Sequence, residues 1–263
     1  MPKPTVLISI QTTGDTTTPT FGRSFVQSLF DEDSRLIPEW LSLTENYKDP
    51  FRGIDDFLAN WWALPVSVTF DGKAMPDRVE GTSWKRKSNL ASRGMVNHGL
   101  VDMRNYKHTG NIWFESRWAV DVDFNHLFDV WLRMSKPELA IFHLFTEPEL
   151  HWQDESADKS FRVGTLGGVA NLGHPNIGWA MAFGKGYSHE VDVSRIKEAG
   201  FPVEEIGDTI VVRVTASIAD VVNNFEFFSR RRAELKSIFR PGMFRIPREP
   251  SERDISRNET ELR

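Results

Sequence analysis

Apolar and polar positions alternate in short blocks at the start of the chain. Residues 6–10 are apolar except for Ser9, which predicts a short buried strand. Two further apolar segments, 25–30 and 36–43, are separated by polar residues that include Asp31, Glu32, Asp33 and Ser34, and this pattern favours a β-hairpin. Pro38 cannot donate a hydrogen bond to a neighbouring strand, so it restricts the second arm to an edge position.

A helix and a long irregular segment are expected next. Asp49 and Pro50 are a typical cap and first-turn residue, and the apolar residues that follow at helical spacing are Ile54, Phe57, Leu58, Trp61 and Trp62. Residues 75–109 show few apolar periods and contain Trp84 beside three basic residues. Long segments of this kind often carry function, so this one is expected to be a surface excursion.

The middle of the chain has clearer periodicity. Alternation over residues 112–120 predicts a half-buried strand, and Asp123 is placed to cap a helix that Pro137 stops. Residues 139–145 are apolar except for His143, which is typical of a central strand covered on both faces.

The C-terminal third also predicts its elements clearly. A strand over residues 179–183 is followed by a short helix that Asp192 caps. A hairpin with its turn at residues 207–208 comes next. The three-and-four spacing over residues 218–239 predicts one long helix, which ends before Pro241.

These elements predict an α+β fold, with a mainly antiparallel sheet and amphipathic helices packed on it. No segment in the earlier part of the chain has the composition of a linker, so residues 1–246 are expected to form a single large domain. Residues 247–263 are charged, contain proline and have little to bury, which is typical of a tail.

Composition and charge narrow the class of protein. The chain of 263 residues has no cysteine, which excludes disulfides, thiolate metal sites and a cysteine nucleophile and favours a reducing compartment. Its 32 Lys+Arg and 37 Asp+Glu give a formal net charge of −5, which disfavours nonspecific nucleic-acid binding as the main role. The start lacks a signal-peptide pattern, and no apolar window reaches the ~20 residues of a membrane span. We therefore expect a soluble, cytoplasmic protein without a membrane partner.

Aromatic residues are frequent, with 9 tryptophans and 19 phenylalanines. Five tryptophans fall on periodic apolar faces and are expected in the core: Trp61, Trp62, Trp118, Trp131 and Trp179. Trp84 and Trp152 lie in irregular charged segments, which makes them candidates for a binding surface. The pattern leaves Trp40 and Trp113 undecided.

The motifs of common catalytic and cofactor sites are missing from the sequence. The histidines lack the spacing of a helical metal site, the glycines near residue 184 lack the spacing and hydroxyl of a P-loop, and there is no Gly-x-Ser-x-Gly elbow. Glu234 and Lys236 have the spacing of a nuclease motif but are expected on a solvated helix face. His143 is expected to be a hydrogen-bonded core histidine. We predict no catalytic residue, no cofactor and no metal, and a protein that is not an enzyme.

Charged segments of both signs are candidates for a partner surface. Basic residues 85–87 and 230–232 could contact phosphates, but successive helix positions point about 100° apart, so the second group cannot form one patch by itself. The acidic stretch over residues 147–158 is either a solvated loop or a surface for a basic partner. The candidate binding residues are Glu147, Glu149, Trp152, Asp154, Glu155, Asp158 and Trp84.

The last third of the chain carries a family resemblance. The segments concerned are the run 178–184, Tyr187, the helix into Gly200 and Phe201, the turn at 206–208, and residues 232–236 and 244–246. They resemble the immunity protein 52 family. Proteins of that family protect bacteria from toxins with a restriction-endonuclease fold, which contact-dependent or type VI secretion routes deliver between cells.

The resemblance implies a protein that binds and neutralises a cognate nuclease toxin in the cytoplasm by steric occlusion. Such a protein needs no cofactor and no direct nucleic-acid contact. Its acidic stretch, residues 147–158, would face the positively charged DNA cleft of the nuclease. A second possibility is that it covers a toxin oligomerisation surface, for which residues 75–109 are as good a candidate.

Two other classes of function remain open at this point. One is a metal-dependent or histidine-based hydrolase of unknown substrate, which would use His143, His151 or His174 with nearby carboxylates. The other is a nucleic-acid-binding accessory protein that uses the basic segments.

Overall fold

The structure, a computed structural model, describes residues 4–44, 46–67, 69–70, 73–74, 78–101, 107–147, 149, 174, 176–246 and 249. The chain divides into two compact units. The N-terminal unit comprises Ile10–Pro137, and the C-terminal unit comprises Met1–Ser9 with Glu138–Arg263. The expectation of a single domain with a separate tail stays a prediction.

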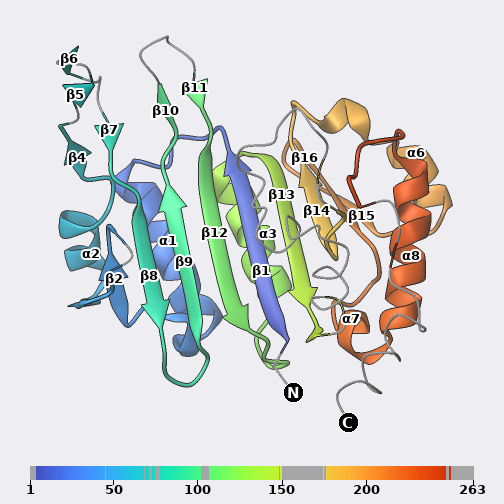
Figure 1. The fold of residues 1–263 in the computed structure, drawn as a ribbon, viewed down its shortest axis with the longest axis horizontal. Helices are drawn as coiled ribbons and strands as arrows, with labels where there is room; N and C mark the ends of the chain where they lie inside the picture. Colours follow the sequence, from blue (N-terminus) through green and yellow to red (C-terminus); the bar gives the residue numbers. More distant parts are fainter. Residues whose placement is uncertain are drawn as a thin grey trace. The chain divides into compact units, whose positions relative to one another are not determined.

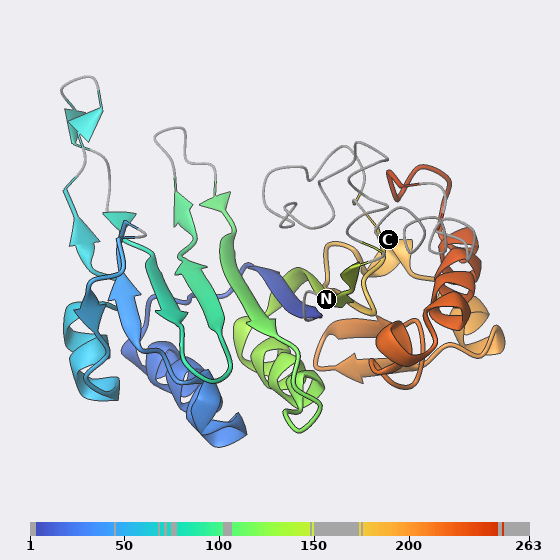
Figure 2. The same ribbon diagram turned by 60° about the horizontal axis from the view of Figure 1, so that its bottom comes forward.

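The N-terminal unit is a layer of strands with helices on one side. Its main strands follow one another in the order β12-β9-β8-β2-β3, and all four neighbouring pairs are antiparallel. Their bounds are β2 (Trp40–Ser42), β3 (Asp49–Pro50), β8 (Thr82–Arg86), β9 (Ser92–Asn97) and β12 (Gly110–Arg117). The helices are α1 (Pro19–Glu32), the short 3₁₀ turn η1 (Ser34–Leu36), α2 (Ile54–Asn60) and α3 (Phe124–Ser135). Both ribbon views place α1 and α3 on the same side of β8, β9 and β12 (Figures 1 and 2).

Short two-stranded pairs extend from this layer. They are β4 (Pro65–Val66) with β7 (Arg78–Val79), β5 (Thr69–Phe70) with β6 (Lys73–Ala74), and β10 (Leu100–Val101) with β11 (Lys107–His108), all antiparallel.

The C-terminal unit combines antiparallel strands with helices. Its strands follow in the order β15-β16-β14-β13-β1, and β13/β14, β14/β16 and β15/β16 are antiparallel pairs. Their bounds are β1 (Thr5–Thr12, which continues into the other unit), β13 (Pro137–Phe145), β14 (Ala180–Phe183), β15 (Val203–Ile206) and β16 (Thr209–Arg213). The helices are η2 (Ser188–Glu190), α6 (Val193–Glu198), α7 (Asp220–Asn223) and α8 (Phe225–Ile238). The predicted α+β class with a mainly antiparallel sheet is confirmed.

The strands of the N-terminal unit alternate between a buried and a half-exposed face. On the inner face, Leu41, Trp84 and Phe114 are fully buried at neighbouring strand positions. Gly94 lies directly opposite Trp84, and a Cβ atom at Gly94 would come within 2.3 Å of the Trp84 indole. Glycine at this position therefore lets the fully buried Trp84 ring pack against the neighbouring strand.

The alternate side chains of the same strands form what we call the outer face. It consists of Trp40, Lys85, Arg93, Met95, Trp113 and Glu115, which are exposed or half-buried. In both ribbon views α1 and α3 lie on the other side of these strands.

The hairpin expected over residues 25–43 is wrong, because its first arm is helix α1. The Thr18 hydroxyl accepts a hydrogen bond from the Phe21 amide at 3.2 Å, and Pro19 occupies the first turn, so both start signals of a helix are present. Phe21, Phe25 and Leu29 recur every four residues and are buried. The alternation in this segment is therefore the buried stripe of a helix.

The irregular excursion expected over residues 75–109 is also wrong for most of its length. Strands β8 and β9 form a regular antiparallel pair within it. Their inner residues Thr82, Trp84, Gly94 and Val96 include only two large apolar side chains, which hides the period of two. Trp84 is 1% exposed and belongs to the core.

Two helix boundaries differ from the expectation as well. Asp49 and Pro50 pair with β2 as strand β3, and the helix begins at Ile54 after Gly53, whose φ is +108°. The single helix expected over residues 218–239 is two helices. Asn224, with φ −150° and ψ 59°, leaves the helical conformation, and its Oδ1 atom accepts a hydrogen bond from the Phe227 amide at 3.4 Å, which caps the second helix, α8.

The remaining predicted elements are confirmed. They are the strands β1, β13 and β14, helix α3 with Asp123 as its cap, helix α6 with Asp192 as its cap, and the β15/β16 hairpin. The strand predicted over residues 112–120 is confirmed as β12 only as far as Arg117, and Val120 is 85% exposed. Trp62, Trp131 and Trp179 are buried as predicted, whereas Trp61 and Trp118 are half-buried.

Candidate functional site

The candidate binding residues divide into three groups. Trp152, Asp154, Glu155 and Asp158 lie outside the described residues. Glu147 is half-buried, and Trp84 and Glu149 are 1% and 0% exposed. In this structure the last two side chains present no surface to a partner, while the role of the whole set in toxin binding stays a prediction.

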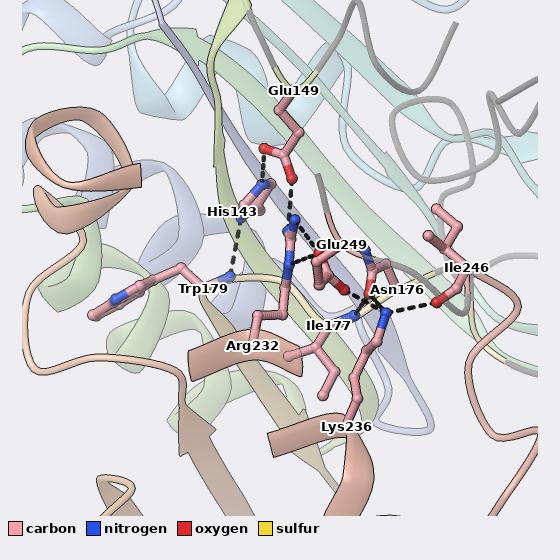
Figure 3. A network of polar contacts seen from close by, with 9 residues as sticks. All are labelled: His143, Glu149, Asn176, Ile177, Trp179, Arg232, Lys236, Ile246 and Glu249. Carbon is pink, nitrogen blue, oxygen red and sulfur yellow. Dashed lines mark hydrogen bonds and ion pairs between the residues drawn. The ribbon is translucent and has the colours of Figure 1, made fainter. Parts of the chain in front are cut away.

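Glu149 belongs to a buried polar network within the C-terminal unit (Figure 3). We call this the His143 network. It joins His143 on β13, Arg232 and Lys236 on α8, and Glu149, Asn176 and Glu249 on segments between or after these elements. The network contains two carboxylates and two basic side chains, so its formal charges balance.

His143 is held by two hydrogen bonds. The backbone N–H of Trp179 donates to Nδ1 at 3.0 Å, so this nitrogen carries no proton. Nε2 therefore carries the proton and donates it to the Glu149 carboxylate at 2.7 Å. The predicted core role of His143 is confirmed. In this arrangement neither ring nitrogen has a lone pair free to accept a substrate proton, which disfavours His143 as a general base.

Arg232 connects the two carboxylates of the network. One guanidinium nitrogen lies 2.6 Å from Glu149 and another lies 2.6 Å from Glu249. Its side chain is 0% exposed, and the guanidinium carbon lies 4.9 Å from the centre of the Phe228 ring one turn earlier. A fully buried arginine is stable only with such partners, because desolvation of its charge is costly.

Lys236 forms the second cationic centre. Its Nζ atom contacts the Glu249 carboxylate and donates to Asn176 Oδ1 at 3.1 Å and to the Ile246 carbonyl at 2.6 Å. The expectation that Lys236 lies on a solvated face is therefore wrong, although Glu234 is on the surface and pairs with Arg231 at 2.6 Å. Burial lowers the pKa of Lys236, and the Glu249 charge opposes this change.

Burial and pairing compete at Glu149. Burial would raise the pKa of its carboxyl group, but interactions with His143 and Arg232 outweigh this effect and lower the pKa to about 2. Burial would likewise lower the pKa of Arg232, and the two carboxylates raise it instead. Glu149 and Arg232 are therefore a charged pair at neutral pH.

The network was only partly foreseeable from the sequence. Arg232 and Lys236 follow the buried Phe228 at steps of four residues, so all three lie on the same side of helix α8. A charged residue within an apolar stripe signals a buried ion pair, and this signal could have identified both residues. Their partners Glu149 and Glu249 lie 83 and 17 residues from Arg232 along the chain, and no local pattern reveals them. The network can hold Glu149 and Glu249 against strand β13 and helix α8, and these two carboxylates balance the charges of Arg232 and Lys236.

The two other candidate catalytic histidines are His174 and His151. His174 is buried, its backbone bridges to Phe244, and burial lowers its pKa to about 4. His151 lies outside the described residues.

Within the described ranges, no group of three or more His, Asp or Glu side chains is placed to hold a metal ion. Over the same ranges, no helix has the length and apolar character needed to cross a bilayer.

The arginine triplet behaves as its helical geometry predicts. Arg230 is exposed, Arg231 lies 3.8 Å from the centre of the Phe201 ring, and Arg232 is buried in the network. The three side chains therefore form no common basic patch.

Comparison with solved structures finds a protein of similar fold. The chain resembles a Pseudomonas aeruginosa T6SS protein, PA0821, with a TM-score of 0.53 and 11% sequence identity, over 81% of this chain and 69% of that chain. At this identity the likeness is one of fold. No protein-family model matches the chain, and no curated protein matches its sequence. Membership of the immunity protein 52 family therefore stays a hypothesis.

Proposed function

We propose that this chain is an immunity protein, which binds a secreted nuclease toxin of a type VI secretion system and neutralises it by steric occlusion. The observation that carries the proposal is the fold likeness, over 81% of the chain, to a protein whose name places it in such a system. The resemblance of residues 178–246 to the immunity protein 52 family supports the same class. The protein acts by binding, in the cytoplasm where the toxin would attack DNA.

The His143 network suits a protein that works as a rigid binding partner. It fixes Glu149, two residues after Glu147 and at the start of the acidic stretch, to strand β13 and helix α8. A protein whose core is rigid before binding loses less conformational entropy when the complex forms, which favours the tight binding that neutralisation requires.

The proposal is tested by toxin rescue. The toxin encoded beside this chain's gene is expressed in a sensitive bacterium with and without this chain, and survival and copurification are measured. We expect growth to be restored and a stable complex to be recovered. If the toxin kills equally in both strains and the two proteins do not copurify, the proposed function is wrong.

The role of the acidic stretch is tested separately with the same toxin. Charge reversal by Asp154→Lys, Glu155→Lys and Asp158→Lys is expected to lower toxin affinity and to reduce its salt dependence, because carboxylates would no longer steer a basic cleft. Unchanged affinity and unchanged salt dependence would remove this stretch from the binding surface. Glu149 is left intact in this design because its side chain is buried.

A further inference from the structure

The outer face of the N-terminal unit combines rings and charges in register. Arg93 on β9 lies opposite Lys85 on β8 and opposite Glu115 on β12. One position along the same face, Met95 lies opposite Trp113. The Arg93 guanidinium carbon is 5.1 Å from the centre of the Trp113 ring. These residues therefore form one continuous surface across three strands.

The rings on this face are partly accessible. Trp113 and Trp40 are half-buried, and Arg93 is 56% exposed. Lys85 Nζ lies 5.7 Å from the centre of the Tyr47 ring, so a second cation is held beside an aromatic group. The helices α1 and α3 pack on the opposite side of these strands (Figures 1 and 2). Tryptophan, tyrosine, methionine and arginine are the side chains that protein–protein interfaces concentrate.

We propose that the outer face is a surface on which this chain binds its toxin, in addition to the acidic stretch, through an acidic and apolar patch of the toxin. The proposal rests on the proposed function and adds a binding surface to it. Lys85 and Arg93 would pair with toxin carboxylates, while Trp113, Trp40 and Met95 provide the apolar contact. The acidic stretch would face the DNA cleft of the toxin, and the outer face would contact a toxin surface outside that cleft.

Charge favours a protein partner over a nucleic acid. Glu115 lies on β12, opposite Arg93, and pairs with it at 2.5 Å, so the face carries few uncompensated cations. Nonspecific binding of a nucleic-acid strand relies on several uncompensated cations along a groove. A protein carboxylate can instead pair with the outer edge of a single arginine in a defined geometry.

The test uses two outer-face variants and one matched control. Arg93→Glu reverses the exposed arginine, and Trp113→Ala removes the ring beside it. Arg23→Glu is the control, since Arg23 on α1 is 55% exposed and pairs with Asp55 at 2.5 Å, much as Arg93 pairs with Glu115. Thermal unfolding is measured for every variant, and Trp113→Phe is added as a second variant that retains an aromatic ring.

The toxin identified by rescue is the probe, and affinity is measured by calorimetry. We expect Arg93→Glu and Trp113→Ala to weaken binding about tenfold or more, with Trp113→Phe intermediate and Arg23→Glu unchanged. If the wild-type chain rescues and binds but both outer-face variants bind equally well, the outer face is not the site. If the wild-type chain neither rescues nor binds, the proposed function fails and this inference fails with it. Binding of a labelled single-stranded oligonucleotide at physiological salt that Arg93→Glu abolishes would also overturn it.

Discussion

Single residues determine the packing of the strands in the N-terminal unit, and Gly94 is the clearest example. Gly94→Ala would place a Cβ atom 2.3 Å from the ring of the fully buried Trp84, so either the ring or strand β9 must shift. Overpacking of this kind costs about 1–3 kcal/mol of the free energy of unfolding. Chemical denaturation measures it.

The control for Gly94 is its neighbour on the opposite face. Arg93→Ala removes an exposed side chain and a surface ion pair, so it should change the free energy of unfolding by less than about 1 kcal/mol. Equal stability of the Gly94→Ala variant and the wild-type protein would show that the Trp84 ring does not depend on this glycine.

His98 gives a residue-level prediction about pH. It is buried beside the Trp62 ring and contacts the Thr16 hydroxyl at 2.9 Å, and burial lowers its pKa to about 4 against an opposing effect of Asp15. Between pH 6.5 and about 4 the unfolded chain binds the proton and the folded chain does not, so acidification favours unfolding. At about 1.4 kcal/mol per pKa unit, the shift from 6.5 to about 4 costs roughly 3 kcal/mol by pH 4.

The measurement is the free energy of unfolding from pH 7.5 to 4, compared between variants. His98→Phe should flatten the loss relative to the wild-type protein, while His174 continues to contribute because its pKa is lowered in the same way. His189→Gln is the control, since this side chain is 73% exposed. Identical profiles of His98→Phe and the wild-type protein would contradict the assignment.

At the scale of elements, helix α8 depends on a buried charge. Arg232→Met would leave the Glu149 and Glu249 carboxylates without their shared cation, and removal of one partner from a buried ion pair costs about 3–5 kcal/mol. Arg230→Met on the same helix is the matched control, because Arg230 is exposed and should tolerate the change. Thermal and chemical unfolding of both variants checks the difference. Equal stability of the two would mean that the network contributes nothing to the fold.

The sequence predicts elements well where the cap and the apolar period agree. Helix α3 follows this rule, with the Asp123 side chain accepting a hydrogen bond from the His126 amide at 2.9 Å. For helix α1 the prediction is wrong because Phe25, Val26 and Leu29 fit both a short strand and a helical stripe, and only the preceding Thr18-Pro19 start signal distinguishes them. For short apolar runs the cap is therefore more informative than the period.

Strands β8 and β9 and the His143 network were hidden for a different reason. The inner positions of β9 are Ser92, Gly94 and Val96, so a buried strand lacks the apolar period that would reveal it. Residue 94 is small because Trp84, ten residues earlier, fills the space above it. Glu149 and Arg232 are likewise 83 residues apart. Both features arise from contacts between distant segments, which local propensity cannot encode.

At the scale of the whole molecule, the C-terminal residues matter through Glu249. This residue lies within the expected tail, yet its carboxylate contacts both Arg232 and Lys236. A chain truncated after Ile246 would keep two buried cations and lose one of their two carboxylates. We expect it to be less stable than the full chain by about 3 kcal/mol or more, because an uncompensated buried charge is costly.

A point substitution separates the charge from the length of the tail. Glu249→Gln in the full chain keeps the length of the tail but removes the negative charge. It should therefore reproduce much of the loss of stability expected on truncation after Ile246. A chain that ends at Pro250 retains Glu249 and should stay close to the full chain in stability. If the chain that ends at Ile246 is as stable as the one that ends at Pro250, residues 247–250 are dispensable. Glu249 would then have no stabilising role, despite its contacts with Arg232 and Lys236.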